Sequence, residues 1–160
     1  MKKIIFLLGI LSFAGCASHK NIVQDSENVN QVLDDWHQAA ADANFNAYFE
    51  KMDENSVFVG TDASEVWTKT AFQKFAKPYF DKGKAWRFKS KQRHLHFDHE
   101  QKTAWFDELL DTWMGECRGS GVLIKKNGKW LIKHYVLSMT IPNKKINSVI
   151  HAIKEERKNE

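Results

Sequence analysis

Three ionisable side chains on consecutive predicted strands could together bind a polar group or transfer a proton. Glu108, Arg118 and His134 each lie in a stretch of alternating apolar residues, which predicts a β-strand. A carboxylate beside an imidazole in an apolar pocket can act as a general base, because burial and nearby charge shift its pKa. A guanidinium there would orient an acidic or carbonyl group of a ligand. The same three groups could instead form a satisfied ion-pair network without catalysis.

The phase of each strand decides whether these groups face inward. If Lys133 faces solvent, strict alternation places His134 on the inward side of its strand. If Lys125 also faces solvent, Arg118 lies inward on the strand before it. Of the two possible rows on the third strand, the row with Glu108 is the more apolar, which places Glu108 inside. We therefore predict His134 and Glu108 as candidate catalytic residues and Arg118 as a ligand-binding residue.

Aromatic residues could supply the apolar walls of the same pocket. The candidates for ligand binding are Trp36, Tyr48, Phe58 and Trp86. Aromatic side chains at helical or strand spacing usually pack the interior, so a core role stays open for them. Trp105 and Trp113 fall in the more polar row of their strand, and exposed large aromatic side chains indicate a contact surface.

Two further motifs have weaker links to chemistry. His94, His96 and Asp98 alternate along one strand face, as metal ligands would, but no further ligand is identifiable. The opposite row has the apolar content of a core face: Arg93, Leu95 and Phe97. We therefore predict that the histidine row faces solvent, and we predict no metal or cofactor. Cys117 follows a glycine-rich stretch and is predicted to be a packing residue.

The N-terminal segment predicts export and lipid attachment. A basic start, an apolar run and two small residues are typical of a secretory signal. Phe13-Ala14-Gly15-Cys16 resembles a bacterial lipobox, whose cysteine is diacylated after cleavage. We predict a signal peptide over 1–15, lipidation at Cys16 and a tether over 16–26. Ala17 is not an aspartate, which favours the periplasmic face of the outer membrane over inner-membrane retention.

Length and charge point to one domain that does not bind nucleic acid. The chain has 160 residues and a net charge of +4, and two of its lysines lie in the predicted signal. The mature chain is therefore nearly neutral, unlike a nucleic-acid-binding domain. With Cys16 lipidated, Cys117 is the only other cysteine, so no internal disulfide is expected.

Periodicity predicts an α+β domain over 27–142, followed by a tail or short helix over 143–160. The predicted helices cover about 26–43, 45–52, 68–80 and 147–158, and the predicted strands cover 56–59, 85–97, 103–113, 118–126 and 129–140. Asn127-Gly128 joins the last two strands as a hairpin. The four long strands follow one another without helical crossovers, so we expect an antiparallel sheet with helices on one face.

Several motifs follow one another along the chain: a Trp-bearing first helix, Val57-Phe58-Val59-Gly60-Thr61-Asp62, Ala104-Trp105-Phe106-Asp107-Glu108, and the strand from Trp130 to Ser138. Their order resembles that in the SnoaL-like domains of the nuclear transport factor 2-like superfamily. The resemblance covers roughly 29–142. It implies a cone-shaped curved sheet, with the N-terminal helices on its concave face and a pocket at the open end. It also implies that the outer sheet face, with Trp105 and Trp113, could form a homodimer.

The superfamily includes isomerase-like and dehydratase enzymes as well as non-catalytic modules, so the fold alone does not determine function. The favoured hypothesis is a membrane-anchored lipoprotein that binds a small, mostly apolar ligand. One alternative is a cofactor-free isomerase or dehydratase that uses His134 and Glu108. The other is a non-catalytic dimerisation module whose cone is filled by its own side chains.

Overall fold

The computed structural model describes residues 13–159. The first twelve residues of the predicted signal peptide lie outside the described residues. The elements, in chain order, are α1 (Phe13–Ala41), α2 (Phe45–Glu50), β1 (Met52–Val59), β2 (Val66–Thr68), α3 (Lys69–Asp81), β3 (Lys89–Phe97), β4 (Thr103–Thr112), β5 (Gly115–Lys126), β6 (Lys129–Met139), the 3₁₀ turn η1 (Asn143–Lys145) and α4 (Ile146–Asn159). The α+β order predicted from the sequence is confirmed.

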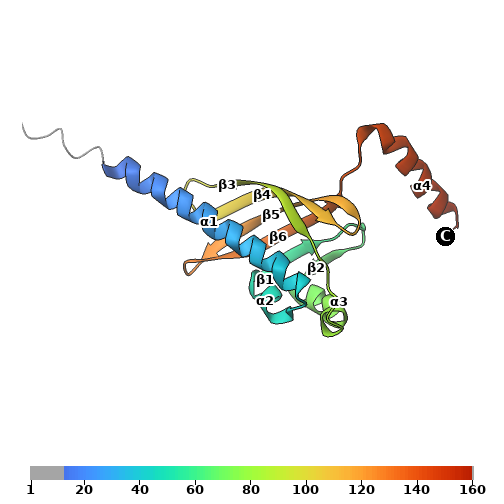
Figure 1. Ribbon diagram of the computed structural model, residues 1–160, viewed down its shortest axis with the longest axis horizontal. Coiled ribbons are helices and arrows are strands. Elements are labelled where there is room, and N and C mark those ends of the chain that lie inside the picture. The colour runs from blue at the N-terminus through green and yellow to red at the C-terminus, as the bar shows by residue number, and fades with distance from the viewer. Residues whose placement is uncertain (1–12, 160) are drawn as a thin grey trace, which may run out of the picture.

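The six strands form one curved sheet in the order β2-β1-β6-β5-β4-β3 (Figure 1). All neighbouring strands are antiparallel except β1 and β6, which pair in parallel. The helix α1 runs across the concave face, and α2 and α3 cover the β1–β2 end. The sheet wraps around its helices, as the resemblance implied.

The first helix begins earlier than the sequence predicted. α1 is continuous from Phe13, so residues 16–26, which we predicted as a tether, form helical turns of α1. Asp25 lies one turn before the core residue Val29 and is itself buried. Its Oδ1 accepts hydrogen bonds from Lys125 Nζ at 2.7 Å and Trp130 Nε1 at 3.0 Å. These contacts attach the helix to the sheet before the predicted domain boundary.

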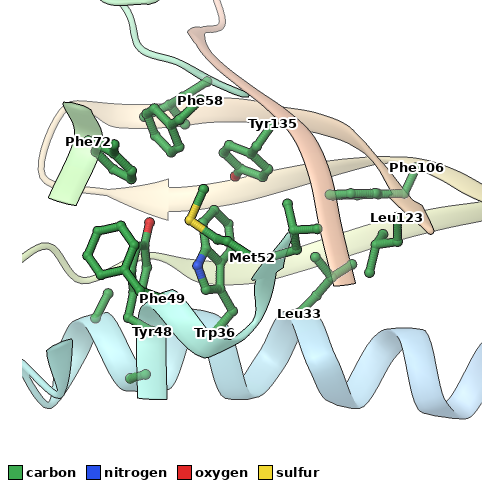
Figure 2. Close-up of a cluster of buried hydrophobic side chains, with 14 of the residues drawn as sticks. Leu33, Trp36, Tyr48, Phe49, Met52, Phe58, Phe72, Phe106, Leu123 and Tyr135 are labelled. Carbon is green, nitrogen blue, oxygen red and sulfur yellow. The ribbon is translucent and has the colours of Figure 1, made fainter. Parts of the chain in front are cut away.

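The core lies between one face of α1 and the concave face of the sheet (Figure 2). Leu33 and Trp36 point from α1 toward side chains of the sheet, including Tyr135 and Phe106. Trp36 stacks on Tyr48 with a centroid distance of 4.9 Å and meets Tyr135 edge-on at 4.7 Å. Large aromatic rings therefore fill much of the cone from inside.

The last element stands apart from the sheet. Figure 1 shows α4 beyond the end of β6, at the opposite end of the molecule from the start of α1. Among the residues that the structure describes, no helix is both long enough and apolar enough to cross a membrane.

Candidate functional site

Glu108 lies at the centre of a buried polar cluster between the sheet and α1. We call Glu108, His37, Arg93 and Tyr135 the sealed cluster. Glu108 projects inward from β4, as predicted, and its side chain has no solvent exposure. Its Oε1 lies 2.8 Å from His37 Nε2, and its Oε2 accepts hydrogen bonds from Arg93 Nε at 3.0 Å and Nη2 at 2.8 Å. Tyr135 donates its hydroxyl proton to Oε1 across 3.3 Å. Both carboxylate oxygens are thus fully used by neighbouring side chains.

The outer side of the same cluster reaches α1 through Arg93. Arg93 Nη1 donates to Asn30 Oδ1 at 3.0 Å, and Nη2 lies 2.9 Å from Asp34 Oδ1. The guanidinium therefore links the buried carboxylate on β4 to the first helix. This arrangement satisfies buried charge instead of leaving a group free for a substrate.

The electrostatics keep Glu108 ionised. Burial alone would raise the pKa of Glu108, but the hydrogen bond and charge of His37 and the charge of Arg93 lower it below the ordinary value of 4.5. Burial and the neighbouring Glu108 carboxylate raise the pKa of Tyr135 well above its usual range, so its hydroxyl stays protonated as a donor.

Gly119 makes room for this cluster on the neighbouring strand. A Cβ at Gly119 would lie 2.2 Å from the Tyr135 hydroxyl oxygen and 3.1 Å from Glu108 Cγ. Any other residue here would push the tyrosine away from the carboxylate. The glycine-rich stretch of β5 is therefore part of the site's architecture.

His134 faces away from Glu108, so the prediction that it lies inside the cone is wrong. Val122 and Leu123 are adjacent on β5 and pair with His134 and Ile132, respectively. Lys133 has no partner in this register and is an extra residue in β6. Such a β-bulge inverts the alternation of side chains. Trp130 and Ile132 face inward as predicted, but beyond the bulge Tyr135 takes the inward position.

Arg118 also faces outward, which corrects the second inward prediction. The prediction assumed that Lys125 faces solvent, but its ammonium pairs with buried Asp25 on the α1 side of the sheet. The inward row of β5 therefore contains Cys117, whose packing role is confirmed by its complete burial. Arg118 is exposed and donates from Nη1 to Asp107 Oδ2 at 3.0 Å.

The predicted ligand-binding aromatic residues divide into two groups. Trp36 and Tyr48 are buried in the core, and neither Trp36 Nε1 nor the Tyr48 hydroxyl has a hydrogen-bond partner there. Phe58 and Trp86 line a recess that opens to solvent. Only this second pair is placed where a ligand could reach it without repacking the core.

We call this recess and its rim the aromatic mouth. Its lining residues are Phe58, Gly60, Thr61, Glu65, Trp67, Phe72, Phe75, Trp86, Phe88, Trp113, Met114 and Leu137. The ring of Phe72 stacks on Phe58 at 4.1 Å, on Trp67 at 5.5 Å and on Trp86 at 5.6 Å between centroids. Phe72 is itself buried by this stacking, so the apolar surface that a ligand can reach comes from more exposed rings such as Trp67 and Trp86.

The recess has a volume of about 160 Å³. An apolar cavity of about 150 Å³ can hold benzene, so this recess fits one aromatic ring or an apolar group of similar size. It is smaller than a typical ligand pocket of about 300–1,000 Å³, because Trp36, Tyr48 and Phe72 fill the interior of the cone.

The aromatic mouth and the sealed cluster are separate. Phe58 stacks on Tyr135 at 5.5 Å, so these two rings stand between the recess and Glu108. Glu65 is the one carboxylate that lines the recess, and its Oε2 already accepts a hydrogen bond from the Asp62 backbone. The aromatic mouth is therefore suited to binding an apolar ligand. The ionised groups of the sealed cluster lie behind Phe58 and Tyr135.

Trp113 belongs to the aromatic mouth instead of the outer sheet face. Its predicted exposure is confirmed, since 82% of it is accessible, but it sits at the turn after β4 and lines the recess. Trp105 remains on the outer face, where it stacks on His96 at 5.7 Å. The prediction that His94 and His96 face solvent is also confirmed.

A wider groove of about 620 Å³ lies between α1 and the β5–β6 hairpin. Exposed polar side chains, including Gln31, Glu50 and Lys129, form much of its wall. No aromatic ring other than Trp130 lines it, so it offers less specific recognition than the aromatic mouth.

Sequence reasoning missed His37 and Arg93 as partners of Glu108. His37 follows Leu33 by four residues and precedes Ala40 by three, so helical spacing already placed it on the buried face. Arg93 was the charged member of an otherwise apolar inward row on β3. His37 and Arg93 are ionisable residues in otherwise apolar, inward-facing rows, and this was the available signal that they contact a buried carboxylate.

The chain belongs to the SnoaL-like domain family, whose profile matches residues 29–142. A nuclear transport factor 2-like protein of unknown function from Pseudomonas putida KT2440 is similar in structure, with a TM-score of 0.62 and 16% identity over 77% of this chain and 91% of that one. A cystatin-like-fold domain from Nostoc punctiforme has a TM-score of 0.66 and 11% identity over 80% and 85%.

A third similar structure is from Novosphingobium aromaticivorans and is provisionally described as a scytalone dehydratase. Its TM-score is 0.64, with 10% identity over 78% of this chain and 89% of that one. These likenesses establish the fold and confirm the family resemblance drawn from the sequence. A search of curated proteins found no match.

Proposed function

We propose that this chain is an exported, lipid-anchored protein whose SnoaL-like domain binds a small, mostly apolar molecule in the aromatic mouth. The observation that carries the proposal is the solvent-open recess of about 160 Å³ between stacked aromatic rings. Its size and walls favour an aromatic ring or a compact apolar group.

The anchor is inferred from the N-terminal sequence. The basic start, the apolar run and Phe13-Ala14-Gly15-Cys16 support cleavage before Cys16 and its acylation. Two or more acyl chains suffice for stable attachment to a bilayer. Incorporation of a radiolabelled fatty acid by the expressed full chain, lost in Cys16→Ser, tests this part of the proposal.

The geometry disfavours the specific enzyme hypothesis that pairs His134 with Glu108. The two side chains lie on opposite faces of the sheet, and Glu108 is closed off from solvent. A general base must reach the proton that it removes, directly or through one water. Apolar binding in the aromatic mouth needs neither group.

A titration with fluorobenzene, followed by ¹⁹F NMR on the full chain in detergent, tests the binding function. Thr61 is exposed at the rim of the recess, and Thr61→Trp would fill the recess without removing a core side chain. We expect this variant to weaken binding at least tenfold. Thr70→Trp on the exposed side of α3 is the matched control and should bind as the wild type does.

Equal affinity in the two tryptophan variants would contradict binding in the recess.

If binding in the recess is supported, mass spectrometry of small molecules that copurify with the protein from native membranes would identify the natural ligand. The ligand class expected is an aromatic or compact apolar molecule.

A homodimer through the outer sheet face is a further part of the proposal. Trp105 is 46% exposed on that face, and the outward side chains of Leu109 and Val122 on β4 and β5 are apolar. Trp105 pairs directly with Val122 across β4 and β5, and exposed large apolar side chains favour association. Sedimentation should show a dimer for the wild type and a monomer for Trp105→Ala; a wild-type monomer would rule this interface out.

A further inference from the structure

The last helix has an apolar face that no other element covers. Ile146, Val149, Ile150 and Ile153 follow helical spacing and form what we call the α4 stripe. The three isoleucines are between 42% and 49% exposed. Figure 1 shows that α4 stands clear of the sheet, so the stripe faces solvent in this structure.

A second apolar surface lies beside the aromatic mouth. We call it the outer groove: it has a volume of about 550 Å³ and is lined by Phe75, Tyr79, Ala85, Trp86, Arg87 and Trp113. Phe75, Trp86 and Trp113 line the recess as well, so the two are continuous. Aliphatic side chains of a helix laid in a groove of aromatic rings are a recurrent mode of recognition.

A short connection joins the two surfaces. The backbone N–H and side chain of Thr140 both donate to the Glu116 carbonyl, at 3.1 and 2.8 Å, which fixes the chain beside the β4–β5 turn that carries Trp113. Five residues lie between Thr140 and Ile146, and a fully extended chain over these six steps would span at most about 20 Å. The fourteen residues of α4 are about 21 Å long.

We propose that α4 docks its stripe in the outer groove of its own domain and thereby covers the aromatic mouth. The short connection gives the helix a local concentration in the millimolar range, far above that of a free partner. The start of α1, which contains Cys16, lies at the opposite end of the molecule (Figure 1), so a membrane that holds Cys16 is remote from α4. The groove is therefore an exposed apolar surface of the same chain that the tethered stripe can bind.

Docking would cover Trp113. It is almost fully exposed with α4 apart, and it forms the wall shared by the recess and the outer groove. The docking itself does not depend on the proposed function. Only its consequence does: a ligand in the recess would be enclosed beneath the helix and would leave more slowly.

Disulfide trapping in the full chain tests the docking directly. Arg87 lies at the exposed edge of the groove, and Ile153 lies in the stripe. Arg87→Cys with Ile153→Cys should form a disulfide within one chain at least tenfold faster than Arg87→Cys with Glu155→Cys. Glu155 lies on the opposite side of the helix, so it is the matched control for random encounters.

Equal rates for the two cysteine pairs, or no disulfide in either, would overturn the proposal. Disulfides only between two chains would also overturn it, because they would place the helix in the groove of a second copy. Peptide mapping by mass spectrometry identifies the bond formed and excludes Cys117.

A second readout uses no new cysteine. Ile150→Ser should increase the accessibility of the outer groove to 8-anilinonaphthalene-1-sulfonate and raise the dye fluorescence severalfold, whereas Glu155→Ser should not. An unchanged signal in Ile150→Ser would contradict docking. Neither experiment uses fluorobenzene, so failure of α4 docking and failure of ligand binding in the recess would be told apart.

Discussion

The sealed cluster around Glu108 and the aromatic mouth are close in space and opposite in character. In the cluster, every oxygen of the carboxylate is bonded to His37, Arg93 or Tyr135. In the mouth, stacked rings line an open recess with one carboxylate at its edge. The ionisable groups of the cluster are closed off from solvent, whereas the accessible lining of the recess is mainly aromatic.

This contrast explains why ionisable residues alone are a poor guide to the site. A buried carboxylate needs donors and positive charge, so the chain supplies them from α1, β3 and β6. Once the carboxylate is satisfied, the cluster links α1, β3 and β6 to β4. The recess is instead lined by the edge of the aromatic core together with more exposed rings such as Trp113.

The largest effect should come from breaking the sealed cluster. Glu108→Leu leaves the charge of Arg93 without its buried partner, and such a loss destabilises a protein by about 3–5 kcal/mol. Urea unfolding measures it. Asp107→Asn, one residue earlier on β4 but facing outward, is the matched control and should cost less than about 1 kcal/mol. Similar losses in both variants would contradict the sealed role of Glu108.

Gly119→Ala should produce the next largest loss. The new Cβ would overlap the Tyr135 hydroxyl, whose oxygen would be only 2.2 Å away. Overpacking of this kind costs about 1–3 kcal/mol. Thermal unfolding of Gly119→Ala beside the outward-facing Ser120→Ala tests it, and a Gly119→Ala protein as stable as the wild type would show that Tyr135 moves freely.

A smaller, pH-dependent effect is expected at Asp53. Burial alone would raise the pKa of Asp53, but hydrogen bonds from Lys126 and Lys133 lower it from 3.8 to about 2. The unfolded chain therefore binds more protons, so the stability from this group is present above pH 4 and is lost as the pH falls toward 2.

The contribution is on the order of 1–2 kcal/mol, because both lysines remain partly exposed and solvent screens them. Urea midpoints between pH 2 and 6 should fall more steeply for the wild type than for Asp53→Asn. Parallel curves for the two proteins would show that the lysines do not hold the carboxylate in its charged form.

The smallest effect on stability should come from the aromatic mouth itself. Trp113 is 82% exposed with α4 apart, so adding Trp113→Ala to the Ile150→Ser variant, in which the helix leaves the groove, should change the free energy of unfolding by less than about 0.5 kcal/mol. The same variant should weaken fluorobenzene binding severalfold, since it removes a wall of the recess. A large loss of stability with unchanged binding would reverse the roles assigned to the two regions.

Much of the fold was predictable from the sequence, because periodicity and the order of motifs are local signals. The inward row of β4, including Glu108, followed from its apolar alternation. The β1–β6 parallel pair and the short strand β2 did not follow, because pairing between distant segments leaves no mark on local spacing.

The candidate site was harder to predict, because a single extra residue inverts a strand. Lys133 as a bulge turned His134 outward, and the pairing of Lys125 with Asp25 did the same to Arg118. Both errors came from treating a lysine as a marker of the solvent side. Lysine side chains are long enough to reach a buried carboxylate from the edge of a core.

The central claim is that the aromatic mouth, and not the sealed cluster, is where a ligand binds. A crystal of the protein soaked with bromobenzene, with the bromine located by its anomalous scattering, tests this most directly. We predict a bromine peak in the recess between Trp67 and Trp86. A peak beside Glu108, or one on the outer sheet face with an empty recess, would contradict the account.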